Sequence, residues 1–437
     1  PPRARAPATL PALTLSISTY IQQNTSRPDM AARPLTLSMY SSAHPAEHRF
    51  PVWWTGDVVY TQLLDNVQKM VNGGLNLQPY VHPDCGAHYG VPFLEETPEM
   101  FVRWAQFCSM GTIIRFHTNN CCDHRPWSWG KKAEDAIRKT LQMRYALMPT
   151  LIAAGRGVTA DGSPLVKRLD LEWPELGAAG ASRDDQYLLA DDILVAPVIP
   201  FNSTGNITNG TANSSRSVWV PPGSWADAWS SVVVKGPTTI AVKNVPMDQI
   251  PMWHRMGSIL ITTAPMGSTV AQNWSSVEDP LTLDVFPFSE IDVMRSGDGA
   301  ATATRFFYDT KTNASQPPRI ALAFTQRAST ATTPSRTTPS AHSLTLSIGE
   351  GPARLWRVRV HLLPGETIES EDLALTTSAS HPNGQAATER VKSYTRSTER
   401  GHGRGDGESR RIVDGLVNVA ESETREIRLD LVFHDIV

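Results

Sequence analysis

The first third of the chain alternates between short apolar runs and stretches with helical periodicity. The runs PLTLS (34–38) and FPVWW (50–54) are typical of buried strands. Residues 61–71 repeat apolar side chains at helical spacing and stop at a Gly-Gly pair, which predicts a helix. The predicted apolar face of this helix consists of Leu63, Val67, Met70 and Val71.

The same alternation continues along the chain. LQPYV (77–81) and GTIIRFHT (111–118) are strand-like, and between them a Thr-Pro-Glu step at Thr97 predicts the start of a helix. A last helix is predicted over residues 132–154, with an interruption near Pro149. Strands and helices that alternate at this spacing predict parallel β/α units.

From about Gly162 the pattern changes to short β-prone pieces separated by Pro, Gly and Asn turns. These pieces include DILVAPVIP, RSVWVPPGSW, TTIAVKNVP and SILITTAP. They are typical of antiparallel sandwich domains, and no helical periodicity competes with them. Residues 328–342 are of low complexity and predict a loop or linker, while residues 387–412 are charged and Gly-rich and are predicted to be solvated. LWRVRVHLL and REIRLDLVF alternate as expected for edge or outer strands.

Polar side chains interrupt the β/α pattern where the predicted strands end. Asp57 follows one strand, Asp84 follows the next, and Arg115 and His117 end the third. In a (β/α)8 barrel these carboxyl ends form the active-site face. Asp57 has two interpretations from the residues alone: a cap for the next helix, or a proton donor kept protonated in an aromatic pocket beside Trp53 and Trp54.

Composition narrows the class of protein. The 437 residues carry a formal charge of -3 with no dominant basic stripe, which gives no reason to expect nucleic-acid binding. No apolar run reaches the roughly 18 residues of a membrane helix. The amino terminus resembles a mature end or a fragment, since it lacks an initiator Met and a signal core.

Two further residue types bear on the cellular compartment. The four cysteines, which show no zinc-type spacing, are predicted to be either buried free thiols or to include one disulfide; they are Cys85, Cys108, Cys121 and Cys122. Seven Asn-X-Ser/Thr sequons occur, at Asn24, Asn202, Asn206, Asn209, Asn213, Asn273 and Asn313. Four of them crowd into FNSTGNITNGTANSS, which predicts a secretory-pathway location: the ER lumen, a lysosome or the extracellular space.

A set of motifs occurs in a fixed order along the chain. In the predicted β/α part they are HRFPVWWTGD, HPDCGAH, RWAQFCSMGTIIRFH and KTLQMRYALMPTL. In the β part they are DDQYLLADDILVAPVI, RSVWVPPGSWADAW and VPMDQIPMWHRMGSIL. Through these motifs, residues 34–262 resemble glycoside hydrolase family 31, the α-glucosidase and α-xylosidase group.

The resemblance implies roles for the residues at the strand ends. It implies that Asp57 is the general acid/base and that Asp84 contacts the sugar in the −1 subsite. It also implies that His88 lines the pocket and that His117 binds a sugar hydroxyl beside Arg115. Among the tryptophans, Trp54 is our candidate for stacking on a sugar face.

Two departures from the family pattern affect these roles. The family's nucleophile is an Asp at a Trp-x-Asp strand end, and nothing before Asp57 matches it; Asp29, the one earlier Asp, has different neighbours. Where the family has an arginine that grips the substrate, this chain has Met39 in LSM. The first departure bears on turnover and the second on binding.

The resemblance also implies a fold: the C-terminal half of a (β/α)8 TIM barrel over residues 1–160, a proximal β-sandwich over 161–262 and a distal β domain over 263–437. Half a barrel leaves open strand edges, so we expect a second chain or an N-terminal segment to complete it. Without that partner, the chain is expected to be poorly soluble or non-native.

The leading functional hypothesis is a retaining α-glycosidase that acts on α-linked glucosyl or xylosyl units of an oligosaccharide or glycoside. Turnover requires a nucleophile, and because no Asp of this chain matches the family's, the chain alone is expected to be inactive. This mechanism needs no cofactor and no metal. The rival hypothesis is a non-catalytic carbohydrate-binding or partner subunit that kept the fold and lost the nucleophile.

Overall fold

The computed structural model describes most of the chain up to residue 264 and a series of strands beyond it. The described ranges are 37–39, 52–90, 96–119, 123–199, 215–264, 281–296, 299–308, 319–328, 340–349, 354–361, 366–367, 376–380, 386–390, 394–399, 410–419 and 425–433. Asp29, Cys121, Cys122, the side chain of Met39 and all seven sequons lie outside what is described. Within the described ranges, no helix combines the length and apolar character needed to span a bilayer.

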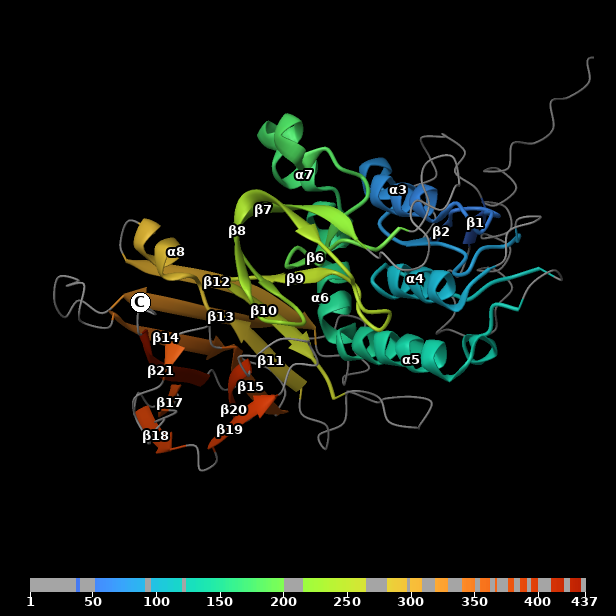
Figure 1. Cartoon of the computed structure of the whole chain (residues 1–437). Coiled ribbons are helices and arrows are strands. Elements are labelled where there is room, and N and C mark those ends of the chain that lie inside the picture. The colour runs from blue at the N-terminus through green and yellow to red at the C-terminus, as the bar shows by residue number, and fades with distance from the viewer. Residues whose placement is uncertain are drawn as a thin grey trace, which may run out of the picture.

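The amino-terminal part consists of parallel strands with helices between them (Figure 1). Its elements are β1 (Leu37–Met39), β2 (Val52–Trp54), α3 (Leu63–Gly73), β3 (Val81–His82), α4 (Pro98–Ser109), α5 (Lys131–Ala146) and α6 (Met148–Asp161). The strands pair in the parallel order β1-β2-β3, and a parallel bridge between Cys85 and Phe116 extends this arrangement. The predicted parallel β/α units are therefore confirmed.

The predicted helices form where the periodicity placed them. The four apolar residues predicted to face inward from α3 are all buried, and the helix ends at Gly73. The side chain of Thr97 caps α4 by accepting a hydrogen bond from the Met100 amide at 3.3 Å. The last helix is interrupted at Leu147, with Pro149 in the first turn of α6, and it runs seven residues beyond the predicted end at residue 154, to Asp161.

The segment 111–118 is not the continuous strand that its apolar pattern predicts. Only Phe116 pairs in the sheet, through a hydrogen bond from the Cys85 amide to the Arg115 carbonyl and one from the His117 amide to the Cys85 carbonyl. Side chains satisfy the backbone at the start of the segment instead. The guanidinium of Arg144 donates to the carbonyls of Ser109, Gly111 and Thr112 at 2.9, 2.6 and 2.7 Å. The ladder is therefore short because side-chain donors occupy carbonyls that a strand would use.

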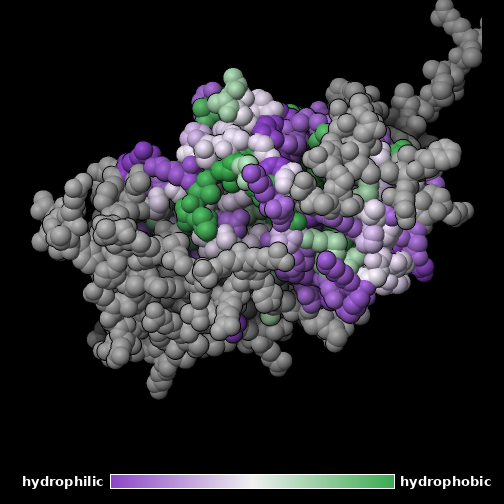
Figure 2. All heavy atoms as spheres, viewed as in Figure 1, coloured by the Kyte–Doolittle hydropathy of each residue, from purple (hydrophilic) through white to green (hydrophobic). Residues whose placement is uncertain are grey.

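The described residues after α6 are β-rich and form three sheets. The six-stranded sheet has the order β4-β5-β6-β9-β7-β8, with β4 (Val166–Lys167), β5 (Tyr187–Leu189), β6 (Ile193–Val195), β7 (Arg216–Asp227), β8 (Val233–Val242) and β9 (Met252–Arg255). Short helical segments that the sequence pattern did not predict precede β5 and β12: α7 (Leu169–Glu172) and α8 (Glu290–Arg295). Figure 2 shows hydrophobic residues gathered over β7 and β8, where β8 forms the edge of its sheet.

Two further sheets pack beyond α6 (Figure 1). The five-stranded sheet has the order β10-β11-β15-β20-β19, with β10 (Ser258–Thr262), β11 (Leu281–Phe286), β15 (Arg354–His361), β19 (Tyr394–Glu399) and β20 (Arg410–Val419). The seven-stranded sheet follows β12-β13-β14-β21-β17-β18, and β16 pairs with β21. Its strands are β12 (Ala300–Tyr308), β13 (Arg319–Ala328), β14 (Ser340–Ile348), β16 (Glu366–Thr367), β17 (Thr376–Ser380), β18 (Ala386–Arg390) and β21 (Arg425–Phe433).

One prediction for this C-terminal region is wrong. The two segments expected at sheet edges, β15 and β21, are internal strands of their sheets. Trp356, Val358 and Val360 of β15 are buried, because alternate residues of this strand pack into the core between sheets. Residues 329–339 of the low-complexity stretch lie outside the described residues, and its ends belong to β13 and β14, so the predicted loop stays a prediction. The described parts of the charged stretch 387–412 lie in three strands, which local composition does not report, and its predicted solvation stays a prediction.

The domain boundaries predicted near residues 160 and 262 stay predictions. The strand β10, placed with the proximal sandwich, pairs with β11 in the five-stranded sheet. The chain therefore passes from one sheet to the next at Gly257, where φ is 78° and the amide donates to the Phe286 carbonyl at 2.8 Å.

A disulfide resolves the alternative for two of the four cysteines. Cys85 follows β3, Cys108 lies in α4, and they are bonded with their Cα atoms 6.0 Å apart. Both residues are fully buried in the core beneath the strand ends. The bond therefore ties the loop that begins at the end of β3 to the helix behind it.

Breaking this disulfide is expected to destabilise the β/α part by about 2–4 kcal/mol, because the unfolded chain regains the freedom of a loop spanning 23 residues. The measurement is urea unfolding of a Cys85→Ser/Cys108→Ser double variant beside the parent chain. Dithiothreitol should lower the midpoint of the parent and leave the variant unchanged. An unaffected parent would contradict the prediction.

Candidate active site

The strand ends place two functional side chains on the same side of the sheet. Successive residues of a strand point to opposite faces, so Trp53 packs into the core while Trp54 faces the cluster at the carboxyl ends. Because β2 and β3 are parallel neighbours in register from Trp53–Val81 to Trp54–His82, the residues after Trp54 and after His82 emerge beside each other. Asp57 and Asp84 belong to these two segments.

Asp84 is the most firmly held member of the cluster. Its side chain is fully buried, and its Oδ1 accepts hydrogen bonds from the guanidinium of Arg115 and from the indole of Trp54 at 2.9 Å. The guanidinium of Arg115 also lies over the Trp54 ring, 5.6 Å from its centroid. The other carboxylate oxygen of Asp84, Oδ2, has no hydrogen-bond partner among the described residues. One edge of the carboxylate is thus fixed, while the other faces the cluster.

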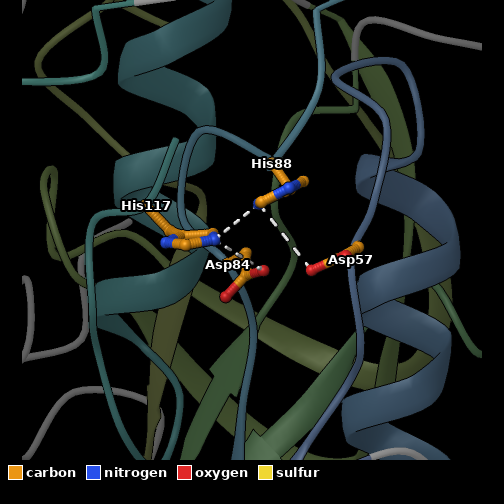
Figure 3. A group of neighbouring side chains, drawn as sticks. All are labelled: Asp57, Asp84, His88 and His117. Carbon is orange, nitrogen blue, oxygen red and sulfur yellow. Dashed lines mark hydrogen bonds and ion pairs between the residues drawn. The ribbon is translucent and has the colours of Figure 1, made fainter. Parts of the chain in front are cut away.

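Two histidines connect the carboxylates. The Nδ1 of His88 lies 2.6 Å from the Nε2 of His117, and the rings are stacked with centroids 4.8 Å apart. One of these nitrogens carries the proton that joins them. The His117 Nε2 lies 3.7 Å from Asp84 Oδ2, and the His88 Nδ1 lies 3.7 Å from Asp57 Oδ1. Figure 3 shows the four side chains pointing toward one another.

Burial lowers the pKa of His117 below its ordinary value, with Arg115 adding to this effect and Asp84 opposing it. The imidazole is therefore neutral near pH 7, and it can accept or donate a hydrogen bond through either nitrogen. A neutral imidazole between two carboxylates suits the recognition of hydroxyl groups, which both donate and accept.

The surroundings of Asp57 differ from the sequence prediction. The aromatic enclosure expected for this residue is wrong, since Trp53 points into the core and Trp54 engages Asp84. Gly56, with φ of 86°, turns the chain between the strand and Asp57, and the Asp57 side chain remains 31% exposed. His88 rather than indole is thus the described neighbour of this carboxyl group. The helix-cap interpretation also fails, because Gln62 is the residue at the start of α3 and no side chain caps it.

Sequence reasoning missed two histidines. His82 ends β3, is buried, and stacks on Trp54 with centroids 6.3 Å apart. Burial and the nearby Arg115 charge lower the pKa of His82, so it is neutral. His124 is buried too and hydrogen-bonds through Nδ1 to the His117 carbonyl at 2.8 Å. Strand alternation places His82, the residue after Val81, at the sheet's carboxyl end, but no local signal identifies His124.

All six residues predicted for the site meet in one cluster: Trp54, Asp57, Asp84, His88, Arg115 and His117. Trp54 ends β2, and the other five come from three segments that follow β2, follow β3 and precede α5. The cluster offers a fixed carboxylate oxygen, two imidazoles, a guanidinium and a partly exposed carboxyl group. These groups can bind a polyhydroxylated molecule and transfer a proton to it. The catalytic and binding roles of the six residues stay predictions.

Family models match two adjacent regions of the chain. Residues 10–154 match the TIM-barrel domain of glycosyl hydrolases family 31, and residues 162–260 match the C-terminal domain of the same family. These two matches coincide with the β/α part and with the six-stranded sheet. They confirm the predicted fold class, a partial TIM barrel followed by β domains.

Similar curated proteins are longer than this chain. A pig neutral alpha-glucosidase AB (Sus scrofa) is 30% identical over 257 residues, which is 58% of this chain and 25% of that protein. An alpha-xylosidase of Saccharolobus solfataricus is 25% identical over 239 residues, 54% of this chain and 30% of the relative. A 1,6-alpha-glucosyltransferase of Sporosarcina globispora is 29% identical over 192 residues, 44% and 14% respectively. The chain thus spans less than a third of each.

Solved structures are similar in fold. A family 31 dextranase of Flavobacterium johnsoniae, in complex with isomaltotriose, matches with a TM-score of 0.61 and 19% identity over 88% of this chain and 44% of the dextranase. A glucosidase II alpha subunit matches with a TM-score of 0.59 and 17% identity over 88% of this chain and 38% of that subunit. At this level of identity the likeness concerns the fold alone.

Proposed function

Because the chain belongs to glycoside hydrolase family 31, we propose that it takes part in retaining hydrolysis of O-glycosyl bonds to α-linked glucosyl or xylosyl units. One observation carries the proposal: a carboxylate oxygen of Asp57 and of Asp84 and a ring nitrogen of His88 and of His117 lie within 4.8 Å of one another, at the carboxyl ends of parallel strands. The names of the similar proteins, an alpha-glucosidase, an alpha-xylosidase and a dextranase, support this class of substrate.

Asp57 is the proposed general acid/base. Retaining hydrolysis requires a carboxylic acid that protonates the leaving oxygen and then, as a carboxylate, accepts a proton from water. The partial exposure of Asp57 allows a substrate and a water molecule to approach it. His88, 3.7 Å away, is suited to holding this carboxyl group in position.

Asp84 is the proposed sugar-hydroxyl acceptor rather than the nucleophile. Its Oδ1 is committed to Arg115 and Trp54, and its side chain is fully buried, which leaves Oδ2 as a fixed acceptor. A nucleophile must instead advance on the anomeric carbon. His117 and His88 would bind neighbouring hydroxyls, Arg115 would hold Asp84, and Trp54 would border the sugar.

A non-catalytic sugar-binding role is the second candidate, and one observation favours it. The described segments before Asp57, residues 37–39 and 52–56, contain no carboxylate that would serve as the nucleophile. In the catalytic case, the second carboxylate must come from another part of the chain or from a partner that completes the barrel. Either function suits a secretory compartment, where the Cys85–Cys108 disulfide would form readily.

The first test is sugar binding by the purified chain. Loss of the charged acceptor in Asp84→Asn is expected to weaken D-glucose binding roughly tenfold to a hundredfold, measured by calorimetry. The matched control is Asp123→Asn, which removes an exposed carboxylate that is bonded to Arg125 and Ser128 outside the cluster. Melting curves of both variants show whether the fold persists. If the parent chain does not bind glucose, the proposal is wrong.

The second test separates the two candidate functions. With an aryl α-glucoside as substrate, turnover by the parent chain that disappears in Asp57→Asn supports the enzyme and means that the chain supplies its own nucleophile. Glucose binding without turnover supports the non-catalytic role. Turnover that persists in Asp57→Asn would remove this residue from the proposed mechanism.

A further inference from the structure

The cluster at the strand ends has the donor set of a transition-metal site. Asp57, Asp84, His88 and His117 each offer one ligand atom, and the four atoms lie within 4.8 Å of one another. Two imidazole nitrogens with two carboxylate oxygens match the ligands that Zn²⁺ prefers, whereas Mg²⁺ and Ca²⁺ favour sites built from oxygen alone.

A second observation points independently to a ligand at this position. The Oδ2 atom of Asp84 is buried and has no hydrogen-bond partner among the described residues, although the neighbouring Oδ1 has two. Leaving a buried carboxylate oxygen without a donor or a cation is costly, so such an atom marks a place for a missing partner. Oδ2 lies on the side of His117, 3.7 Å from its Nε2.

Charge and support also favour a cation. Two carboxylates and the guanidinium of Arg115 give the cluster a formal charge of about −1 when both imidazoles are neutral. Arg115 and Trp54 hold Asp84 through the oxygen that faces away from the histidines, as outer partners of a metal ligand commonly do. Arg115 itself repels a cation, but the two nearer carboxylates outweigh one guanidinium.

Zinc binding requires the four ligand atoms to move. In a tetrahedral zinc site with bonds of about 2.0–2.1 Å, neighbouring ligand atoms lie about 3.3 Å apart. The two nitrogens, now 2.6 Å apart, must separate slightly, the two carboxylate-to-nitrogen distances, now 3.7 Å, must shorten, and the widest separations, up to 4.8 Å, must shorten most. Asp57 and His88, with side chains 31% and 19% exposed, have room to adjust, while Asp84 is fixed.

We propose that this cluster binds one Zn²⁺ ion through Asp57, Asp84, His88 and His117, and that the ion and the sugar exclude each other. The ion would take the place of the proton shared by the two histidines. Binding of the ion stands on the geometry alone, while the exclusion rests on the proposed function, since the same atoms are assigned to sugar hydroxyls.

The test is calorimetric titration of the untagged, chelator-treated chain with ZnCl₂. We expect one ion per chain, no comparable binding of MgCl₂, and a loss of at least about tenfold in affinity for both Asp57→Asn and His88→Gln. Asp123→Asn, the exposed control, should bind like the parent. Both test variants alter partly exposed side chains, so the test survives if a change at the buried Asp84 prevents folding.

Two results would overturn the proposal: no saturable zinc binding by the parent chain, or binding that neither variant weakens. The same titration in saturating D-glucose tests the exclusion, which predicts weaker zinc binding. Undiminished zinc binding in glucose would overturn the exclusion. Zinc binding by a chain that does not bind glucose would support the metal site and reject the proposed function, whereas glucose binding without zinc binding would do the reverse.

Discussion

Replacing Arg144 with methionine is expected to lower the free energy of unfolding of the β/α part by at least about 3 kcal/mol, because three buried carbonyl groups would lose their donor at about 1–3 kcal/mol each. The guanidinium of Arg144 bonds to Ser109, Gly111 and Thr112, at the point where α4 ends. Burial lowers the pKa of Arg144 to about 10, which still leaves it charged at neutral pH and favourably placed at the negative end of the helix.

The consequence should extend to the site. Arg115 and His117 lie on the segment that Arg144 anchors, so Arg144→Met should also weaken D-glucose binding. Chemical unfolding followed by tryptophan fluorescence measures the first effect, and calorimetry measures the second. Arg138→Met, on the same helix but 59% exposed, is the control and should change neither quantity appreciably. Equal stability of the two variants would refute the anchoring role.

Arg103→Met is expected to have the second large effect, a destabilisation of about 3–5 kcal/mol together with uncoupling of the loop between β8 and β9 from α4. The Arg103 side chain is 1% exposed and lies in α4. Its guanidinium donates to the carbonyls of Val245, Pro246 and Gln249 in the loop between β8 and β9, at 2.8, 3.2 and 2.9 Å. Methionine would fill the space but leave these three carbonyls without the guanidinium that donates to them.

Proteolysis gives a direct measurement of this uncoupling. In Arg103→Met, the loop 245–249 should be cut faster under native conditions, because its hold on α4 is reduced to the bond from Gln106 to the Met247 carbonyl at 2.8 Å and the packing of the Met247 side chain. Arg125→Met, which removes an exposed ion pair, serves as the control. If the loop resists proteolysis equally in both variants, Arg103 does not fasten it to α4.

These two arginines show where sequence reasoning reaches its limit. Arg103 belongs to the RWAQ motif and Arg144 to MRYALMP, but the motifs predict no role for either residue. Locally, a buried arginine on an amphipathic helix resembles an exposed one. What distinguishes it is a set of carbonyls from residues far along the chain, up to 146 positions away for Arg103 and Gln249.

The helices and the strand ends were accessible because their signals are local. Thr97, a capping residue followed by a proline, predicts the start of α4, and the inward face of α3 follows from the 3.6-residue repeat. Proximity of Asp57, Asp84 and His117 followed from one topological rule, that parallel strands end on the same side. The rule requires only strand order, which is why a sequence without any contact information could place these residues together.

Strand positions within the C-terminal sheets were not accessible in this way. The segment containing Trp356 alternates as an edge strand would, yet β15 has β11 on one side and β20 on the other. Alternation reports which face of a strand is buried, but it carries no information on how many neighbours the backbone has. The strands within the charged stretch 387–412 were not accessible for the same reason, since β20 pairs with residues 354–361.

The Cys85–Cys108 bond makes the handling of the protein part of every measurement on the site. Cys85 is the next residue after Asp84, and the bond is its covalent link to α4. A chain produced in a reducing bacterial cytosol would carry two thiols here, whereas one exported to the periplasm would carry the bond. Preparations from the two sources therefore differ in the covalent structure next to Asp84. Their affinities for sugar and zinc should be compared only after the thiol content has been titrated.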